Sequence, residues 1–84
     1  MHRGGATNIV FGRVTRSPAT MLNTLEIQIR LDSGRLMELE VPSGHCAIDV
    51  NERIRISYSF SQHSGDLPLV QEIYSVTYQR KIFP

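Results

Sequence analysis

Apolar and polar residues alternate along much of this chain with a period of two. The segments 25–31, 37–41 and 54–60 each place a branched, sulfur-containing or aromatic side chain at every second position and a polar or charged one between. The segment 74–78 repeats the pattern, and 8–15 is an earlier, less regular segment. Such alternation is typical of β-strands with one buried face. No stretch repeats apolar residues at helical spacing, so the sequence predicts five strands and no long helix.

The register between the second and third of these strands follows from the side chains alone. If residues 32–34 (Asp-Ser-Gly) form the loop, Ile29 faces Met37 and all the apolar residues of both strands share one face. A two-residue loop would instead pair Ile29 with Glu38 and divide the apolar residues between the faces, which a buried sheet does not tolerate. Gly34 also stands at the loop position that favours a left-handed backbone in three-residue hairpins. The sequence therefore predicts a hairpin closed by a three-residue loop.

A small number of short strands favours a barrel, because closing the sheet protects the strand edges. We predict an all-β fold, a five-stranded OB-like antiparallel barrel, with an SH3-like small barrel as the alternative topology. The 84 residues are expected to form one domain, 1–84, with flexible tails at 1–7 and 80–84 and a mobile polar loop at 61–68. So short a chain buries only roughly 60–65% of its unfolded surface. With a single cysteine, Cys46, no internal disulfide forms, and a partner is the expected source of further stability.

The charge balance favours a protein partner over nucleic acid. The net charge is only +1, far from the basic excess of proteins that bind along phosphate backbones. Residues 1–35 carry five arginines against two carboxylates, a net +3, whereas residues 36–84 carry four basic against six acidic side chains, a net −2. One basic and one acidic region suit a protein interface. No apolar run approaches the about 20 residues of a membrane span, and no signal peptide is visible, so we expect a soluble, cytoplasmic protein.

Neither a metal site nor a nucleophilic centre is predicted. The three histidines and Cys46 show no ligand spacing, and no paired carboxylates occupy a cleft-like pattern, so we expect no catalytic residue, no metal, no cofactor and no small-molecule substrate. The tyrosines and Phe60 share the parity of core positions, which leaves no continuous stacking surface for single-stranded nucleic acid.

The candidate partner-docking residues are charged side chains on the outward faces or ends of the predicted strands, together with one aromatic residue near the C-terminus. They are Arg13, Arg16, Glu38, Glu40, Arg53, Arg55 and Phe83. The simpler interpretation of the charged pairs on two of the strands is a solvated outer face that limits self-association.

Three parts of the chain carry a resemblance to a known family. They are 9–14 (IVFGRV) with the hairpin that leads into 37–42 (MELEVP), 48–56 (IDVNERIRI), and 69–76 (LVQEIYSV). These stretches resemble the small OB-like subunit of archaeal DNA-directed RNA polymerase that is the counterpart of the eighth common subunit of the eukaryotic enzymes. The resemblance spans roughly residues 8–79 and consists of strand and turn patterns; the long insertion and the Gly-Gly-Leu-Leu-type ending of eukaryotic members are lacking.

The resemblance implies a non-catalytic accessory subunit that docks at the periphery of the largest polymerase subunit and supports assembly in transcription. The sequence leaves open whether such a subunit also touches nucleic acid within the complex. The alternative function is a free-standing OB-fold protein that binds single-stranded nucleic acid.

Overall fold

The computed structural model describes residues 7–42, 47–60 and 68–84, and their regular structure is entirely β. Its seven strands are, in chain order, β1 (Asn8–Val14), β2 (Ala19–Met21), β3 (Thr24–Leu31), β4 (Leu36–Pro42), β5 (Arg53–Ser59), β6 (Leu69–Ser75) and β7 (Arg80–Phe83). All the pairings between them are antiparallel. The predicted all-β antiparallel class is confirmed, and no helix long and apolar enough to cross a membrane occurs in the described ranges.

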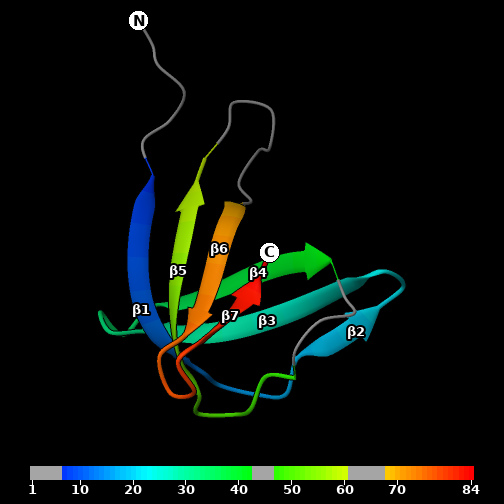
Figure 1. The fold of residues 1–84 in the computed structure, drawn as a ribbon, viewed down its shortest axis with the longest axis horizontal. Helices are drawn as coiled ribbons and strands as arrows, with labels where there is room; N and C mark the ends of the chain where they lie inside the picture. The colour runs from blue at the N-terminus through cyan, green and yellow to red at the C-terminus, as the bar shows by residue number, and fades with distance from the viewer. Residues whose placement is uncertain (1–6, 43–46, 61–67) are drawn as a thin grey trace, which may run out of the picture.

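The strands form one curled sheet that makes a half-barrel. Its order is β2-β3-β1-β5-β6-β7, with β4 paired to the other side of β3. In Figure 1, β1, β5 and β6 stand side by side, while β3 and β4 cross behind them at a steep angle. The curl is centred on β1, which pairs with β5 along Asn8–Arg13 but with β3 only along Gly12–Val14.

The predicted hairpin is confirmed in both register and loop. Ile29 lies opposite Met37, and the two apolar pairs further along the strands also match. The Leu31 N–H donates to the carbonyl of Arg35 at 2.8 Å, and the Gly34 N–H donates to the carbonyl of Leu31 at 2.8 Å. Gly34 has a φ of 96°, the left-handed conformation that its loop position requires.

The concave face of the sheet holds a core of branched aliphatic side chains. The buried hydrophobic residues are Val14, Ile27, Ile29, Leu39, Val41, Ile48, Ile54, Ile56, Ile73 and Ile82. Those of β3, β4 and the first half of β5 are the inward positions that the alternation predicts. The pattern therefore identified the faces of these strands correctly.

In two places the predicted alternation is wrong. At the end of β5, Ser59 is buried and Phe60 is 51% exposed, where Phe60 was expected in the core or at its rim. Beside it the β5–β6 register shifts between Ser57 and Tyr58, with the extra residue, Gln71, on β6. Near the C-terminus, β6 ends at Ser75 and residues 76–79 form a turn. The expected strand at 74–78 is therefore displaced toward 69–75, and Tyr78 is exposed.

The expectations of five strands and of a C-terminal tail at 80–84 are also wrong. Gln79, with a φ of 55°, ends the turn and reverses the chain, so that Arg80–Phe83 pair with β6 as β7 and Ile82 enters the core. Similarly, Leu22 with a φ of 53° allows the tight turn between β2 and β3. Expectations for the N-terminal tail up to residue 6, for Cys46 and for the loop 61–67 lie outside the described residues.

Candidate protein-docking surfaces

The seven predicted docking residues fall on three separate parts of the half-barrel. Arg53 and Arg55 lie on the outer face of β5, with Arg13 opposite Arg53 on β1. The acidic pair and Arg16 lie on or beside the outer face of β3 and β4. Phe83 lies on β7 and packs partly against the core. Phe83 is therefore not a free anchor, and the seven residues do not form a single site.

On the outer face of β1, β5 and β6, arginines lie against aromatic rings. The guanidinium carbon of Arg53 is 5.4 Å from the centroid of Phe11, and that of Arg55 is 4.8 Å from the centroid of Tyr74. We call these four residues the arginine–aromatic face. Cation–π contacts at partly exposed sites contribute roughly 0.5–1 kcal/mol each. They also hold the arginines flat against the sheet.

Carboxylates neutralise both arginines of this face. Arg53 donates two hydrogen bonds to Asp32, at 3.0 and 2.8 Å, and Arg55 lies 3.2 Å from Glu72. Lys81 on β7 lies 3.5 Å from the same Glu72. Each cation that borders the rings is thus already paired, so the face has little net charge with which to attract phosphate.

The bidentate contact with Arg53 lowers the pKa of Asp32 below its ordinary value of 3.8. The hydrogen bond from Arg53 is the main cause; desolvation opposes it, and the charges of Arg53 and Arg13 act in the same direction as the hydrogen bond. The pair joins the β3–β4 loop to the start of β5, two segments 21 positions apart in the chain.

We predict that this pair gives the fold an acid-sensitive contribution. Because the pKa of Asp32 is lower in the folded chain than in the unfolded one, the contribution is fully present above about pH 4 and is lost as the pH falls through the folded-state pKa. Urea unfolding followed by circular dichroism from pH 6 to pH 2.5 should show a steeper fall in the unfolding free energy for wild type than for Asp32→Asn. Glu40→Gln, which removes another exposed carboxylate, is the control. Equal slopes for Asp32→Asn and wild type would contradict the prediction.

The outer face of β3 and β4 is acidic. Glu26 lies directly opposite Glu40, and Gln28 lies opposite Glu38. The Gln28 amide donates to Glu38 at 3.2 Å, and Arg16 is 3.8 Å from the same carboxylate. A shallow depression of about 70 Å³ lies among Arg16 and the three glutamates. The two glutamates expected on the outer face of β4 are thus joined by a third from β3, with one arginine at the edge.

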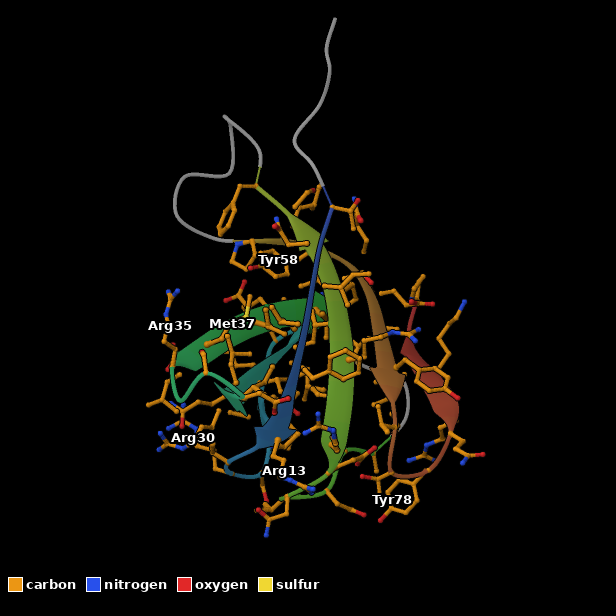
Figure 2. All side chains as sticks on the ribbon, turned by 90° about the vertical axis from the view of Figure 1, so that its left-hand side faces the viewer. Arg13, Arg30, Arg35, Met37, Tyr58 and Tyr78 are labelled. Atoms are coloured by element: carbon orange, nitrogen blue, oxygen red, sulfur yellow. The ribbon has the colours of Figure 1, made fainter. Side chains whose placement is uncertain are left out.

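A larger groove opens where the half-barrel fails to close. It has a volume of about 200 Å³ and lies between the start of β4, the end of β5 and the residue that precedes β6. We call it the seam groove. Its lining residues are Leu31, Arg35, Leu36, Met37, Glu38, Tyr58, Phe60 and Pro68. Figure 2 shows Arg35 and Met37 next to each other, on the same side of the molecule as Tyr58.

Most of the residues that line the seam groove are apolar or aromatic, and several are partly exposed. Leu36 is 52% exposed, and the rings of Tyr58 and Phe60 meet edge to face with centroids 5.5 Å apart. Sequence reasoning missed this site because it assigned Tyr58 and Phe60 to the core or its rim. One signal was present: Leu36 shares the outward parity of Glu38 and Glu40, and an apolar residue on an otherwise charged strand face is typical of a contact surface.

A polar corner lies at the opposite end of the sheet. The Tyr78 hydroxyl donates to Asp49 at 2.6 Å, and the Arg80 guanidinium stacks on the Tyr78 ring at 5.2 Å. The pKa of Tyr78 is raised above its ordinary value of 10.0. The hydrogen bond to Asp49 is the main cause, followed by the charge of Asp49, burial and the charge of Glu52, with Arg80 acting in the opposite direction.

We predict that Tyr78 ionises at a lower pH in Asp49→Asn than in wild type, because the substitution removes the negative charge that opposes tyrosinate. Ultraviolet titration of tyrosinate, with Tyr78→Phe subtracted to isolate this residue, measures the shift. Since the folded-state pKa is the higher one, the stabilising contribution is present below pH 10 and is lost as the pH rises through that pKa. An unchanged Tyr78 titration in Asp49→Asn would show that Asp49 does not control this hydroxyl.

Within 7–42, 47–60 and 68–84, no three or more His, Cys, Asp or Glu side chains group so as to hold a metal ion. Arg13 donates to the carbonyl of Asn51 at 2.9 Å and so braces a loop.

Comparison with family models, with curated proteins and with solved structures gave no match.

Proposed function

We propose that this chain is a non-catalytic accessory subunit of an archaeal DNA-directed RNA polymerase, which docks on the largest subunit in the cytoplasm and supports assembly. The observation that carries the proposal is the strand order. The meander β1-β3-β4 is followed by β5, which returns to the free side of β1, and then by β6. Such a Greek-key return in a partly open antiparallel sheet is the arrangement expected of an OB-type barrel.

The five strands of seven or eight residues supply this arrangement, and the two short strands are additions to it. β2 extends the edge beside β3, and β7 extends the edge beside β6. The OB-type interpretation agrees with the family resemblance over residues 8–79, where the same five segments carry the similar sequence patterns.

Surface charge favours a protein partner over nucleic acid. In OB barrels the face of the second and third strands of the meander binds oligonucleotides. Here the corresponding strands, β3 and β4, present Glu26, Glu38 and Glu40, which repel phosphates. The exposed apolar side chains of the seam groove, Leu36 and Phe60, also favour docking of a protein.

The test is reconstitution with the other subunits of an archaeal polymerase. The tagged chain is mixed with the purified largest subunit, and separately with the enzyme assembled without its own small OB-like subunit. We expect one copy of the chain to co-elute with the large subunit in size-exclusion chromatography at physiological salt. A chain that folds but elutes alone in both mixtures would overturn the proposal.

A second candidate function, single-strand binding, is favoured by one observation, the arginine–aromatic face. Partly exposed rings beside arginines are typical of stacking platforms. Fluorescence anisotropy with labelled oligothymidylate and oligouridylate tests it: an affinity that falls steeply with salt and is lost in Phe11→Ala supports this function. The proposed docking function expects no binding at physiological salt, since Asp32 and Glu72 already pair with the arginines.

A further inference from the structure

The seam groove runs beside a strand edge with which no described strand pairs. β4 pairs with β3 on one side, and no strand of the described ranges pairs with its other side. Bonded and non-bonded residue pairs alternate along an antiparallel ladder. The pair of Leu31 and Arg35 is bonded, so the pairs that contain Leu36 and Glu38 are non-bonded pairs. The backbone N–H and C=O groups of Leu36 and Glu38 therefore point away from β3. These backbone groups face the seam groove, which Leu36 and Glu38 help to line.

The groove beside this edge has room for a side chain. Its volume of about 200 Å³ exceeds the roughly 150 Å³ of an apolar cavity that admits benzene. Tyr58 and Phe60 form its far wall. An apolar side chain held by a strand next to β4 would therefore bury the exposed surfaces of Leu36 and Phe60.

The charge at the groove selects for an acidic residue. Arg35 lines the groove, and none of the carboxylates in the described parts of the chain forms an ion pair with it. Glu38, the acidic residue of the groove, is already close to Arg16 and accepts a hydrogen bond from Gln28. The guanidinium of Arg35 is thus available for the carboxylate of a partner.

We propose that the seam groove binds an extended segment of a partner protein, which adds as a strand to the free edge of β4, inserts an apolar side chain against Tyr58 and Phe60, and pairs an aspartate or glutamate with Arg35. Strand addition of this kind takes affinity from main-chain hydrogen bonds and specificity from side-chain pockets. The inference rests on the proposed function, because it names the manner in which this subunit holds its partner.

Proline at position 38 isolates the main-chain part of the mechanism. The Glu38 N–H points to the free edge, so Glu38→Pro removes an outward donor and leaves the β3–β4 ladder intact. Glu38→Gln removes the same charge and keeps the donor, which makes it the matched control. Arg35→Glu tests the charge, with Arg30→Glu as its control, since Arg30 is exposed on the same hairpin and binds only the Gly34 carbonyl among the described residues.

The experiment is selection of a phage-displayed random twelve-residue peptide library on the full-length chain, with an unrelated small β domain as the counter-target. We expect the selected peptides to alternate apolar and polar residues and to contain an aspartate or glutamate. Synthetic versions should lose affinity at least about tenfold with Glu38→Pro and with Arg35→Glu. They should bind Arg30→Glu as they bind wild type, and Glu38→Gln at least as tightly as wild type, because that substitution removes a carboxylate from the groove. Because Phe60 is exposed, Phe60→Ala is a second variant that should fold and should weaken binding.

Failure of this inference and failure of the proposed function give different results. If no peptide is enriched, or if the enriched peptides bind Glu38→Pro and Phe60→Ala as tightly as wild type, the strand-addition inference is overturned. Co-elution of the Glu38→Pro chain with the large polymerase subunit would then place docking on another face. If peptides behave as expected but no polymerase subunit co-elutes with wild type, the groove is a peptide site of a protein outside transcription.

Discussion

Gly12→Ala is expected to lower the free energy of unfolding by about 3 kcal/mol, at the upper end of the range for overpacking. A Cβ at position 12 would lie 2.6 Å from the carbonyl oxygen of Arg30 and 2.7 Å from Cγ2 of Ile29. The first of these atoms belongs to the backbone of β3, so relief requires β1 and β3 to separate. Gly12 pairs with Leu31 on one side and with Ile54 on the other, at the point where the sheet curls.

Denaturant unfolding followed by circular dichroism measures this effect, and Gly34→Ala is the comparison. Gly34 has a positive φ but nothing within 4 Å of an added Cβ, so its substitution should cost only about 1–2 kcal/mol through backbone strain. For a domain whose whole stability is about 5–10 kcal/mol, the first substitution removes a large fraction. A Gly12→Ala chain as stable as Gly34→Ala would show that β1 and β3 adjust without loss.

The part of the fold that sequence predicted well is local. The hairpin of β3 and β4 was predicted because two alternating segments are joined by a short loop. A loop longer or shorter by one residue would place the apolar side chains of one strand opposite the polar side chains of the other. Gly34 alone meets the conformational demand of the loop. Every observation needed lay within residues 25–41, which is why the register could be worked out without any knowledge of the remaining chain.

The parts that sequence predicted poorly depend on contacts between distant segments. The bulge beside Tyr58 places one extra residue, Gln71 of β6, in the β5–β6 ladder, and beyond it Ser59 is buried while Phe60 is exposed. No period along a single strand reports such an insertion, because it is defined by two strands. β7 was missed for a related reason: its turn uses Gln79 at a positive φ, where glycine or asparagine would have given a signal.

The candidate docking surfaces show the same difference between features that are local in the sequence and features that depend on distant segments. Parity placed Arg53 and Arg55 together on an outer face, and the structure agrees. Parity did not reveal that these arginines form ion pairs with Asp32, in the β3–β4 loop, and with Glu72, on β6. Charge that looks available in a sequence is often already paired across the sheet. In this chain the accessible cation of the groove is Arg35, which no sequence pattern distinguishes from Arg30.

Substitution of Glu52 is expected to have the second large effect on stability, because its buried carboxyl group closes the turn that leads into β5. The residue is 2% exposed. Its Oε1 accepts the Asp49 N–H at 2.8 Å, and its backbone N–H donates to the Asp49 carbonyl at 3.1 Å. The turn is tied to β1 in addition, since Val14 donates to the carbonyl of Glu52 and accepts from the N–H of Asn51. The side chain thus stabilises a connection on which the β1–β5 pairing depends.

Glu52→Ala is expected to lower the unfolding free energy by about 2 kcal/mol, because it leaves the Asp49 N–H without its acceptor and creates a small void. Glu52→Gln should stay within about 1 kcal/mol of wild type, since the amide oxygen can accept the same hydrogen bond. The amide also replaces Oε2, which is buried and has no hydrogen-bond partner in the described part of the chain. Urea unfolding at pH 7 of wild type, Glu52→Gln and Glu52→Ala compares the three. If glutamine proves as destabilising as alanine, the turn depends on the carboxylate charge and not on the hydrogen bond to Asp49 alone.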